Sequence, residues 1–253
     1  MCRIIFINTQ FNKNILSKFF DQSIKKKYTP NLDNPRDQDL HLDGFGFIWN
    51  EKNKTFMYKN YLRPNMDYNL KTILDLIDTE FFIGHLRATK KLCSAPVNYH
   101  STHPFNYQDF YFCHNGCVSN FKNNKKIILD GVSMKYYSMI KSNCDSEYLF
   151  YLFLSIFDIT DNSSILKRLK ITVDKFFEFL NLISGVVSAN IMIKYKDIVI
   201  VTRFINNDEE PPSLYRNEDY TIISSEPVMD NEILIEKNSV IIFKNKKYKE
   251  FKV

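Results

Sequence analysis

The residues best suited to chemistry in this 253-residue chain begin at its second position. Cys2 follows Met1, so removal of Met1 would leave a thiol and a free α-amine on one residue. A thiol usually has a pKa of about 8.5 and an α-amine one of about 7.7–8.0, so the amine can take the thiol proton near neutral pH. A cysteine taken alone is more often a small core residue, so the role of Cys2 depends on its surroundings.

Three other sets of residues could complete a site around such a nucleophile. The Asn115 amide and the Gly116 N–H can both donate to one developing oxyanion, although Asn-Gly at the end of a strand is also an ordinary turn. Arg87 ends an apolar segment, where it could bind a substrate carboxylate or form a structural ion pair. Asp145 precedes a helical pattern, and it could cap that helix or accept a substrate ammonium. Together they suit attack on the side-chain carbonyl of a free α-amino acid.

These residues fall in motifs that resemble the class II glutamine amidotransferases, a family of N-terminal nucleophile (Ntn) hydrolases. The resemblance is strong over residues 2–150 and weaker beyond them. The motifs are, in chain order, Met1-Cys2-Arg3, Asp43-Gly44-Phe45-Gly46 with Trp49, Gly84-His85-Leu86-Arg87-Ala88-Thr89, His103-Pro104-Phe105, His114-Asn115-Gly116 with Asn120-Phe121, Asp145-Ser146-Glu147 and, as an echo, Ser224-Ser225-Glu226-Pro227.

The resemblance implies both a fold and a catalytic apparatus. The fold is of the α+β class, a four-layer αββα sandwich of two mainly antiparallel sheets, with Cys2 at the end of a central strand. Cys2 would be the nucleophile, with its own α-amine as the base. Asn115 and Gly116 would form the oxyanion hole. The expected reaction is cleavage of the γ-amide of glutamine or of a γ-glutamyl compound through a γ-glutamyl thioester.

The resemblance also implies a substrate pocket without a metal or a cofactor. Arg87 would bind the α-carboxylate of the substrate, and Asp145 its α-ammonium. His103 would support the site. Thr89 and His85, which lie in the Arg87 motif, would help to shape the pocket.

Departures from the family pattern bear on the substrate. The sugar-phosphate and nucleotide branches have Gly after the cysteine and Trp after the arginine, where this chain has Arg3 and Ala88. The Cys-Arg opening is similar to stand-alone members that degrade γ-glutamyl peptides such as glutathione or hydrolyse γ-glutamyl metabolites. Lys90-Lys91 replaces the small residue that often follows the arginine motif.

Two alternatives stay open at this point. The chain could be a non-catalytic or partner-dependent subunit of a complex that degrades γ-glutamyl peptides or uses ammonia. It could also be an unrelated cysteine hydrolase that pairs Cys113 or Cys117 with a histidine. Substitution of Cys2 separates the last reading from the thioester mechanism.

Composition favours a cytoplasmic protein without nucleic-acid or membrane partners. The five cysteines are an odd number and no leader is apparent, which favours reduced thiols, and Cys113 and Cys117 lack a second ligand pair for a metal. No apolar run is long enough for a membrane span. The net charge is +5, in small lysine clusters without a nucleic-acid motif. We therefore expect no nucleic-acid and no membrane partner, while a partner subunit remains an option.

Apolar periodicity predicts how the chain is organised. Strands are expected over 2–8, 44–50, 55–59, 81–87 and 109–114, and again over 186–195, 197–204, 220–224, 239–243 and 248–253. Helices are expected over 11–24, after Asp67, over 146–157 after Asp145, and over 164–183. The segments 28–42 and 88–102 are expected to be loops, and 117–144 is ambiguous. No linker or repeat divides residues 1–253, so we expect one domain.

Overall fold

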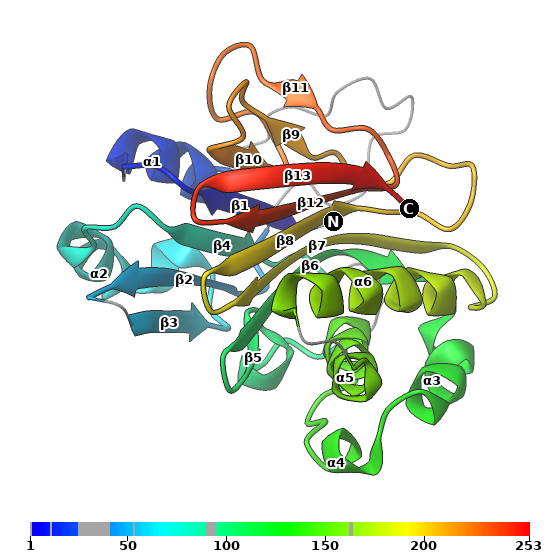
Figure 1. Cartoon of the computed structure of the whole chain (residues 1–253). Coiled ribbons are helices and arrows are strands. Elements are labelled where there is room, and N and C mark those ends of the chain that lie inside the picture. Colours follow the sequence, from blue (N-terminus) through cyan, green and yellow to red (C-terminus); the bar gives the residue numbers. More distant parts are fainter. Residues whose placement is uncertain (1, 11, 25–40, 53, 90–94, 162–163) are drawn as a thin grey trace.

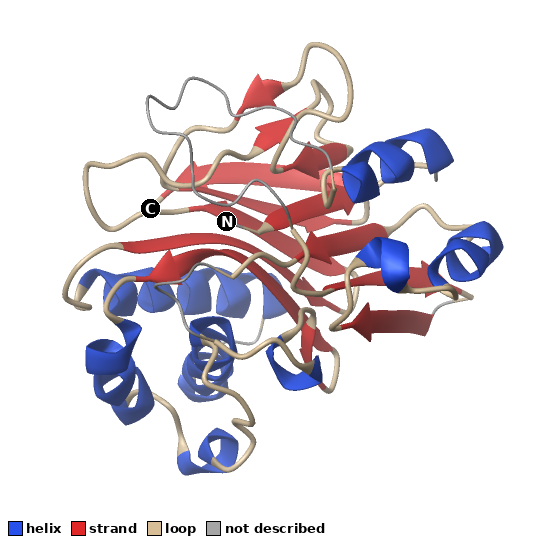
Figure 2. Ribbon diagram, turned by 180° about the vertical axis from the view of Figure 1, so that it is seen from behind, coloured by secondary structure: helices blue, strands red, loops and turns tan. Residues whose placement is uncertain are grey.

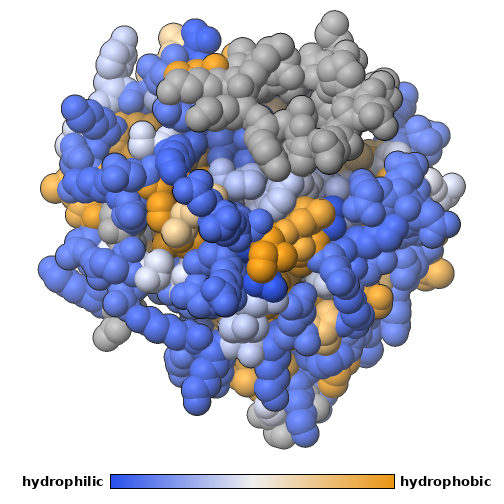
Figure 3. Space-filling model, turned by 90° about the horizontal axis from the view of Figure 1, so that it is seen from above, coloured by the Kyte–Doolittle hydropathy of each residue, from blue (hydrophilic) through white to orange (hydrophobic). Residues whose placement is uncertain are grey.

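The computed structural model describes residues 2–10, 12–24, 41–52, 54–89, 95–161 and 164–253. Within these ranges two β-sheets stack face to face, and helices cover both outer sides (Figure 1, Figure 2). The face drawn in Figure 3 is mostly hydrophilic, with apolar side chains in separate patches. The expected α+β sandwich with four layers is confirmed.

The first sheet has β1 near its centre. Every strand pair between described residues of this sheet is antiparallel. Its strands come from both ends of the chain, since β1 pairs with β10. Its order is β11 (Ile233–Leu234), β9 (Tyr215–Arg216), β10 (Ile222–Ser224), β1 (Arg3–Ile7), β4 (Phe82–Leu86), β2 (Phe45–Glu51) and β3 (Lys54–Asn60).

Every strand pair between described residues of the second sheet is also antiparallel. Its long central pair of strands, β6 and β7, faces β1 across the sandwich. Its order is β13 (Lys247–Lys252), β12 (Ser239–Lys244), β8 (Ile198–Arg203), β7 (Val187–Tyr195), β6 (Phe110–Val118) and β5 (Phe105–Tyr107).

Helices close the two outer faces. α1 (Lys13–Asp21) and α2 (Leu70–Leu76) share an apolar cluster with the first sheet. α5 (Asp145–Ile159) and α6 (Ile165–Asn181) share one with the second sheet, and α3 (Phe121–Asp130) and α4 (Met134–Tyr137) pack on α5. Two short 3-10 turns, η1 (Pro64–Met66) and η2 (Tyr99–Ser101), lie in connecting segments.

Strand alternation decides which way the N-terminal residues point. Ile4 and Phe6 lie in the apolar cluster between the sheets, whereas Ile5 and Ile7 lie in the cluster under α1 and α2. Because side chains alternate along a strand, Cys2 shares the face of Ile4 and points between the sheets. The buried β1 strand that the sequence predicts therefore aims the thiol at the second sheet.

Most predicted elements are confirmed, and two predicted termini are wrong. β6 runs on to Val118, so Asn115 and Gly116 lie inside a strand, paired with Asn190 and Ala189, and not in a turn. Asp67 does not cap α2, whose N-cap is Asn69. The Asp67 carboxylate instead accepts hydrogen bonds from Tyr58 Oη and Asn60 Nδ2 at 2.6 and 2.8 Å, which ties it to β3.

The helix that starts at Asp145 is not amphipathic as expected. Every residue from Ser146 to Phe157 is buried, because α5 lies between the second sheet and α3, α4 and α6. A helix that is apolar all round is typical of a fully enclosed position. The ambiguous segment 117–144 contains the end of β6, α3 and α4. The predicted loop over 28–42 falls almost wholly outside the described residues.

Candidate active site

A small cavity at one end of the sandwich gathers most of the residues that the sequence singled out. It has a volume of about 50 Å³. Of the expected site residues, six line it: Cys2, Arg87, Thr89, His103, Gly116 and Asp145. Cys117, Cys144, His114 and Ser146 line it as well. Asn115 does not line the cavity and is described below.

The Cys2 thiol is uncharged at neutral pH, because the effect of burial on its pKa outweighs that of the nearby positive charge. Burial raises its pKa, and the Arg87 guanidinium opposes that shift. The thiol lies 3.7 Å from the Ala88 carbonyl oxygen, to which it can donate a weak hydrogen bond. A buried thiol needs a base before it can act as a nucleophile. Met1, whose removal would free the α-amine of Cys2, lies outside the described residues.

Arg87 is buried without a carboxylate partner among the described residues. Its guanidinium donates to the backbone carbonyls of Asp43, Ala95 and Pro96 at 3.2, 3.4 and 3.2 Å. These contacts fix the side chain but leave its positive charge unneutralised. The sequence left two roles open for Arg87, a structural ion pair and a substrate contact. The described residues contain no such ion pair, and the charge of Arg87 borders the cavity.

Asp43 does not pair with Arg87, because Thr89 occupies its carboxylate. The Thr89 N–H and hydroxyl donate to Asp43 Oδ2 at 2.6 and 2.7 Å. The Asp43 N–H also donates to the Arg87 carbonyl oxygen at 3.1 Å, and the Arg87 N–H donates to the Gly44 carbonyl oxygen at 2.8 Å. Thr89 thus holds the loop that carries the Asp43-Gly44 motif against the Arg87 motif, besides lining the cavity.

Asp145 lies in the first turn of α5, where a carboxylate is favoured by the helix dipole. It accepts hydrogen bonds from the backbone N–H of Val118 at 2.9 Å and of Ser146 at 2.7 Å. Cys144 Sγ lies 3.7 Å from the same carboxylate, whose four or so lone-pair positions leave capacity for a further donor from the cavity. The capping role expected from the sequence is wrong, because the N-cap of α5 is Cys144 and no side chain caps the helix. The ammonium-binding role stays a prediction.

The direction of the Gly116 N–H follows from its neighbours in β6. Successive residues of a strand direct their N–H and C=O groups to opposite edges. The His114 carbonyl accepts from His85 Nε2 at 3.2 Å, and the Val118 N–H donates to Asp145, so both point away from β7. Gly116 lies between them and shares their direction. Its N–H is therefore directed toward the cavity that it lines.

Only glycine fits at position 116. A Cβ atom there would lie 1.9 Å from the Ser188 carbonyl oxygen and 2.5 Å from His114 Nε2. His114 Nε2 is 3.0 Å from that same oxygen, so it carries the proton, and its Nδ1 accepts from Ser146 Oγ at 2.8 Å. Glycine thus lets the paired strands β6 and β7 and the His114 ring approach closely beside the cavity.

Asn115 points between the sheets, toward the strand that carries Cys2. Its Nδ2 donates to Ser225 Oγ at 3.2 Å, and its buried Oδ1 has no hydrogen-bond partner among the described residues. Ser225 Oγ also accepts from the Ile4 N–H at 2.9 Å, and the Ser225 N–H donates to the Ile4 carbonyl. Ser225 therefore connects the side chain of Asn115 to β1, two residues beyond Cys2.

Three buried histidines lie together beside the site. The His85 and His103 rings stack with centroids 4.0 Å apart, and His85 reaches the His114 carbonyl. Burial lowers the pKa of His85 to about 3 and lowers those of His103 and His114 too, so all three are neutral. Gly46 makes room for His103, because a Cβ there would lie 2.2 Å from the His103 carbonyl oxygen.

Arg3 has a carboxylate partner on the far side of β1 from the cavity. Its guanidinium donates to Glu226 and to the Cys2 carbonyl, the latter at 3.3 Å. Burial raises the pKa of Glu226, and Arg3 opposes that shift. The Arg3–Glu226 pair and Ser225 explain the Ser-Ser-Glu echo. The sequence signalled that motif but gave it no role. Ser146 stood in the Asp145 motif without a role of its own, and Ser188 carried no signal.

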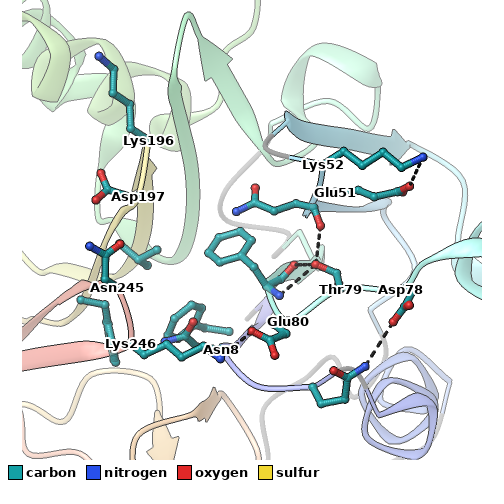
Figure 4. Close-up of a pocket in the computed structure, with 16 residues that line it drawn as sticks. Asn8, Glu51, Lys52, Asp78, Thr79, Glu80, Lys196, Asp197, Asn245 and Lys246 are labelled. Atoms are coloured by element: carbon teal, nitrogen blue, oxygen red, sulfur yellow. Dashed lines mark hydrogen bonds and ion pairs between the residues drawn. The ribbon is translucent and has the colours of Figure 1, made fainter.

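A larger cavity of about 700 Å³ lies at the opposite end of the sandwich (Figure 4). It is lined by Glu51, Asp78, Glu80, Lys196 and Lys246, among others, and by no cysteine or histidine. The described part of the chain holds no cluster of metal-binding side chains. None of its helices is long and apolar enough to span a membrane.

Comparisons with known proteins agree with the fold and the motifs. No family model matches the chain. A curated relative, the probable glutamine amidotransferase DUG3 of Saccharomyces cerevisiae, is 28% identical over 167 residues, which are 62% of this chain and 46% of the relative. The chain thus spans about half the length of the curated relative that it matches.

Solved structures share the fold of this protein over the whole chain. A glutamine aminotransferase class-II domain protein from Silicibacter pomeroyi superposes with a TM-score of 0.64 at 17% identity, covering 100% of this chain and 99% of that one. The glutamine phosphoribosylpyrophosphate amidotransferase of B. subtilis superposes at 0.62 and 15% identity, over 100% of this chain and 49% of that one. The resemblance to class II glutamine amidotransferases is confirmed. The chain has their sandwich fold.

Proposed function

We propose that this protein cleaves the γ-amide of glutamine or of a γ-glutamyl compound through a γ-glutamyl thioester on Cys2. The observation that carries the proposal is the cavity that Cys2 shares with Arg87, Asp145 and Gly116. An unneutralised guanidinium, a carboxylate with spare lone pairs and an inward N–H surround one thiol there. These are the complements of an α-carboxylate, an α-ammonium and an oxyanion.

The reaction balances with the groups of this chain and one water. After Met1 is removed, the α-amine of Cys2 takes the thiol proton, and Sγ attacks the γ-carbonyl carbon. The oxyanion is stabilised by the Gly116 N–H and by Asn115. The amide nitrogen leaves with the proton as ammonia or an amine. Water then hydrolyses the thioester, releases the γ-carboxylate and regenerates the thiol.

Specificity for an α-amino acid would come from charge. Arg87 would bind the substrate α-carboxylate, and Asp145 would bind its α-ammonium. Because both groups are held by several backbone hydrogen bonds, they are ordered before the substrate arrives, which lowers the entropy cost of binding. His103 and Thr89 would shape the pocket without titrating.

We further propose that the 253 residues act as one domain. Its support is the sharing of the first sheet by β1 and the late strand β10. The leaving group, the compartment and any protein partner are separate questions. Since the curated relative is about twice as long as the matched region, partner dependence is a property to test with the isolated chain.

The direct test measures glutamate release from glutamine, glutathione and other γ-glutamyl amides by the Met1-processed protein. Cys2→Ala should lower the rate by about 10³-fold or more, since the nucleophile is lost. Cys113→Ala is the matched control, because Cys113 is buried in the apolar layer between the sheets. Full activity in Cys2→Ala, with activity lost in a Cys113 or Cys117 variant, would contradict the proposal and favour the cysteine–histidine alternative.

A further inference from the structure

A groove beside the outermost strand of the second sheet has no role in the amidase site. It lies between α6 and the β12–β13 hairpin and has a volume of about 850 Å³. β13 forms the edge of its sheet (Figure 1), and among the described residues it pairs only with β12, which leaves its other edge without a strand partner there. Five lysines line this lysine groove: Lys167, Lys170, Lys244, Lys247 and Lys249.

The lysine groove carries positive charge that the described residues leave unneutralised. Lys170 pairs with Asp174 at 2.7 Å. The other four lysines form no ion pair within the described ranges. Glu250 also borders the groove, but its carboxylate accepts a hydrogen bond from Tyr220 at 2.6 Å, on the opposite face of β13. The charge of the groove is therefore complementary to an acidic ligand.

The floor of the groove is apolar. Leu166, Ile242 and Phe251 are half-buried and border it. Side chains alternate along β13, so Lys247, Lys249 and Phe251 face the groove together. The Lys170 ammonium lies 4.7 Å from the centre of the Phe251 ring. A ligand that matches this surface carries both negative charges and an apolar side chain.

Lysines on an edge strand have a simpler function, since they discourage strands of other molecules from pairing with it. That function accounts for Lys247 and Lys249. It does not account for Lys167 and Lys170, which lie on α6, nor for a hollow with an apolar floor. An edge that is only protected would be flat or charged throughout.

We propose that the lysine groove docks an acidic, extended segment of a partner protein. The segment would add to the free edge of β13 by backbone hydrogen bonds. Glutamate or aspartate side chains at alternate positions would lie opposite Lys247 and Lys249, and an apolar side chain would pack on Phe251. Nucleic acid is disfavoured because the groove has no arginine and its floor is mainly aliphatic.

The test measures fluorescence anisotropy of a labelled peptide with glutamates at two alternate positions followed by phenylalanine at the next alternate one. The double variant Lys247→Glu/Lys249→Glu should weaken binding by about tenfold or more, since two favourable charge pairs become repulsive. Lys122→Glu, an exposed lysine on α3, is the matched control and should leave the affinity unchanged. A peptide with glutamine in place of glutamate should bind as weakly as the double variant does.

Equal affinity of the peptide for wild type and double variant would overturn the proposal. So would tighter binding of a single-stranded oligonucleotide or of phosphatidylserine vesicles with the same dependence on Lys247 and Lys249. Hydrolysis of glutamine by the isolated protein should be the same in wild type and double variant. Failure of the docking proposal is therefore separable from failure of the proposed reaction.

Discussion

The two ends of the sandwich differ in how their charges are satisfied. At the Cys2 end, the cavity has about 50 Å³, and the Arg87 guanidinium meets only backbone carbonyls. At the opposite end, the cavity has about 700 Å³, and two of its lysines pair with glutamates, Lys246 with Glu80 at 2.6 Å and Lys52 with Glu51 at 3.9 Å. Figure 4 shows these polar side chains around an open space.

The difference teaches that size is a poor guide to the site in this fold. Exposed ion pairs contribute little to stability, and their charges are neutralised without a ligand. A buried charge without a counter-charge is expensive, so its persistence indicates that something else neutralises it. The smaller cavity is therefore the better candidate for substrate, and variants at the two ends should behave differently.

The largest expected effect comes from removing a charged side chain of the site and comparing substrates with and without the group that this side chain would bind. Arg87→Gln should lower kcat/KM for glutamine by about 10²–10³-fold, because truncating one partner of a buried charge pair costs about 3–4 kcal/mol. With 4-aminobutanamide, which lacks the α-carboxylate, wild type and Arg87→Gln should react at similar rates. Steady-state kinetics with both substrates measures this.

Asp145→Asn tests the other charge of the site in the same way. It should lower kcat/KM for glutamine but not for glutaramate, which lacks the α-amine. An equal loss on all substrates for either variant would mean that the residue supports the fold and not substrate charge. Thermal melting of each variant separates these outcomes.

Gly116→Ala should sharpen the comparison through stability. Its Cβ would lie 1.9 Å from the Ser188 carbonyl oxygen, so the paired strands β6 and β7 must move apart. We expect a loss of about 3 kcal/mol or more in the free energy of unfolding, measured with urea. Gln10→Ala, which lines the opposite cavity, should change it by less than about 0.5 kcal/mol. Similar small losses in both variants would contradict the packing described for Gly116.

Stability should fall in acid because of the buried histidines. The pKa of His85 is about 3 in the folded protein against 6.5 for the free side chain, so the unfolded chain binds more protons between these values. Stability is therefore complete above pH 6.5 and is lost as pH falls toward 3, by up to about 1.4 kcal/mol per pH unit for each such histidine.

A substitution at His103 tests that pH dependence. Its two ring nitrogens have no hydrogen-bond partner in the described part of the chain, so His103→Phe should keep the stack on His85 and reduce the slope of stability against pH. His100→Ala, at an exposed position, should leave the slope unchanged. Urea midpoints measured between pH 7 and pH 5 give the slopes, and an unchanged slope in His103→Phe would contradict the neutral stack.

The smallest effect is expected at Ser225. Ser225→Ala removes the acceptor of the Asn115 amide and of the Ile4 N–H. We expect kcat to fall by about tenfold with KM nearly unchanged, because the oxyanion donor is misplaced while the charges that bind substrate remain. In an Asn115→Ala background the same change should have almost no further effect. Additive losses would show that Ser225 does not act through Asn115.

The sequence predicted the strands and long helices well because their apolar periodicity is local. It predicted the sandwich through motif order. It did not place Asn115-Gly116 inside β6, because the pairing that extends the strand comes from Asn190 and Ala189, far along the chain. It also misjudged Asp67 and the polarity of α5, since both depend on tertiary neighbours.

The candidate site shows the same limit. Cys2, Arg87 and Asp145 could be recognised because each is a chemically conspicuous residue in a motif. Ser225 could not be assigned a role, because its contacts with Ile4 and Asn115 join segments that only the fold brings together. Thr89 was expected beside the substrate. Its N–H and hydroxyl donate to the Asp43 carboxylate, a contact that the sequence did not predict.

The central claim is that Cys2, freed by removal of Met1, is the nucleophile. The most direct measurement treats the purified protein with an electrophilic glutamine analogue and determines the intact mass and the modified peptide by mass spectrometry. We expect a chain that lacks Met1 and carries one adduct, on Cys2, with glutamine protecting against labelling. An unlabelled Cys2 in the processed chain, or an adduct on Cys113, Cys117 or Cys144 instead, would contradict the account.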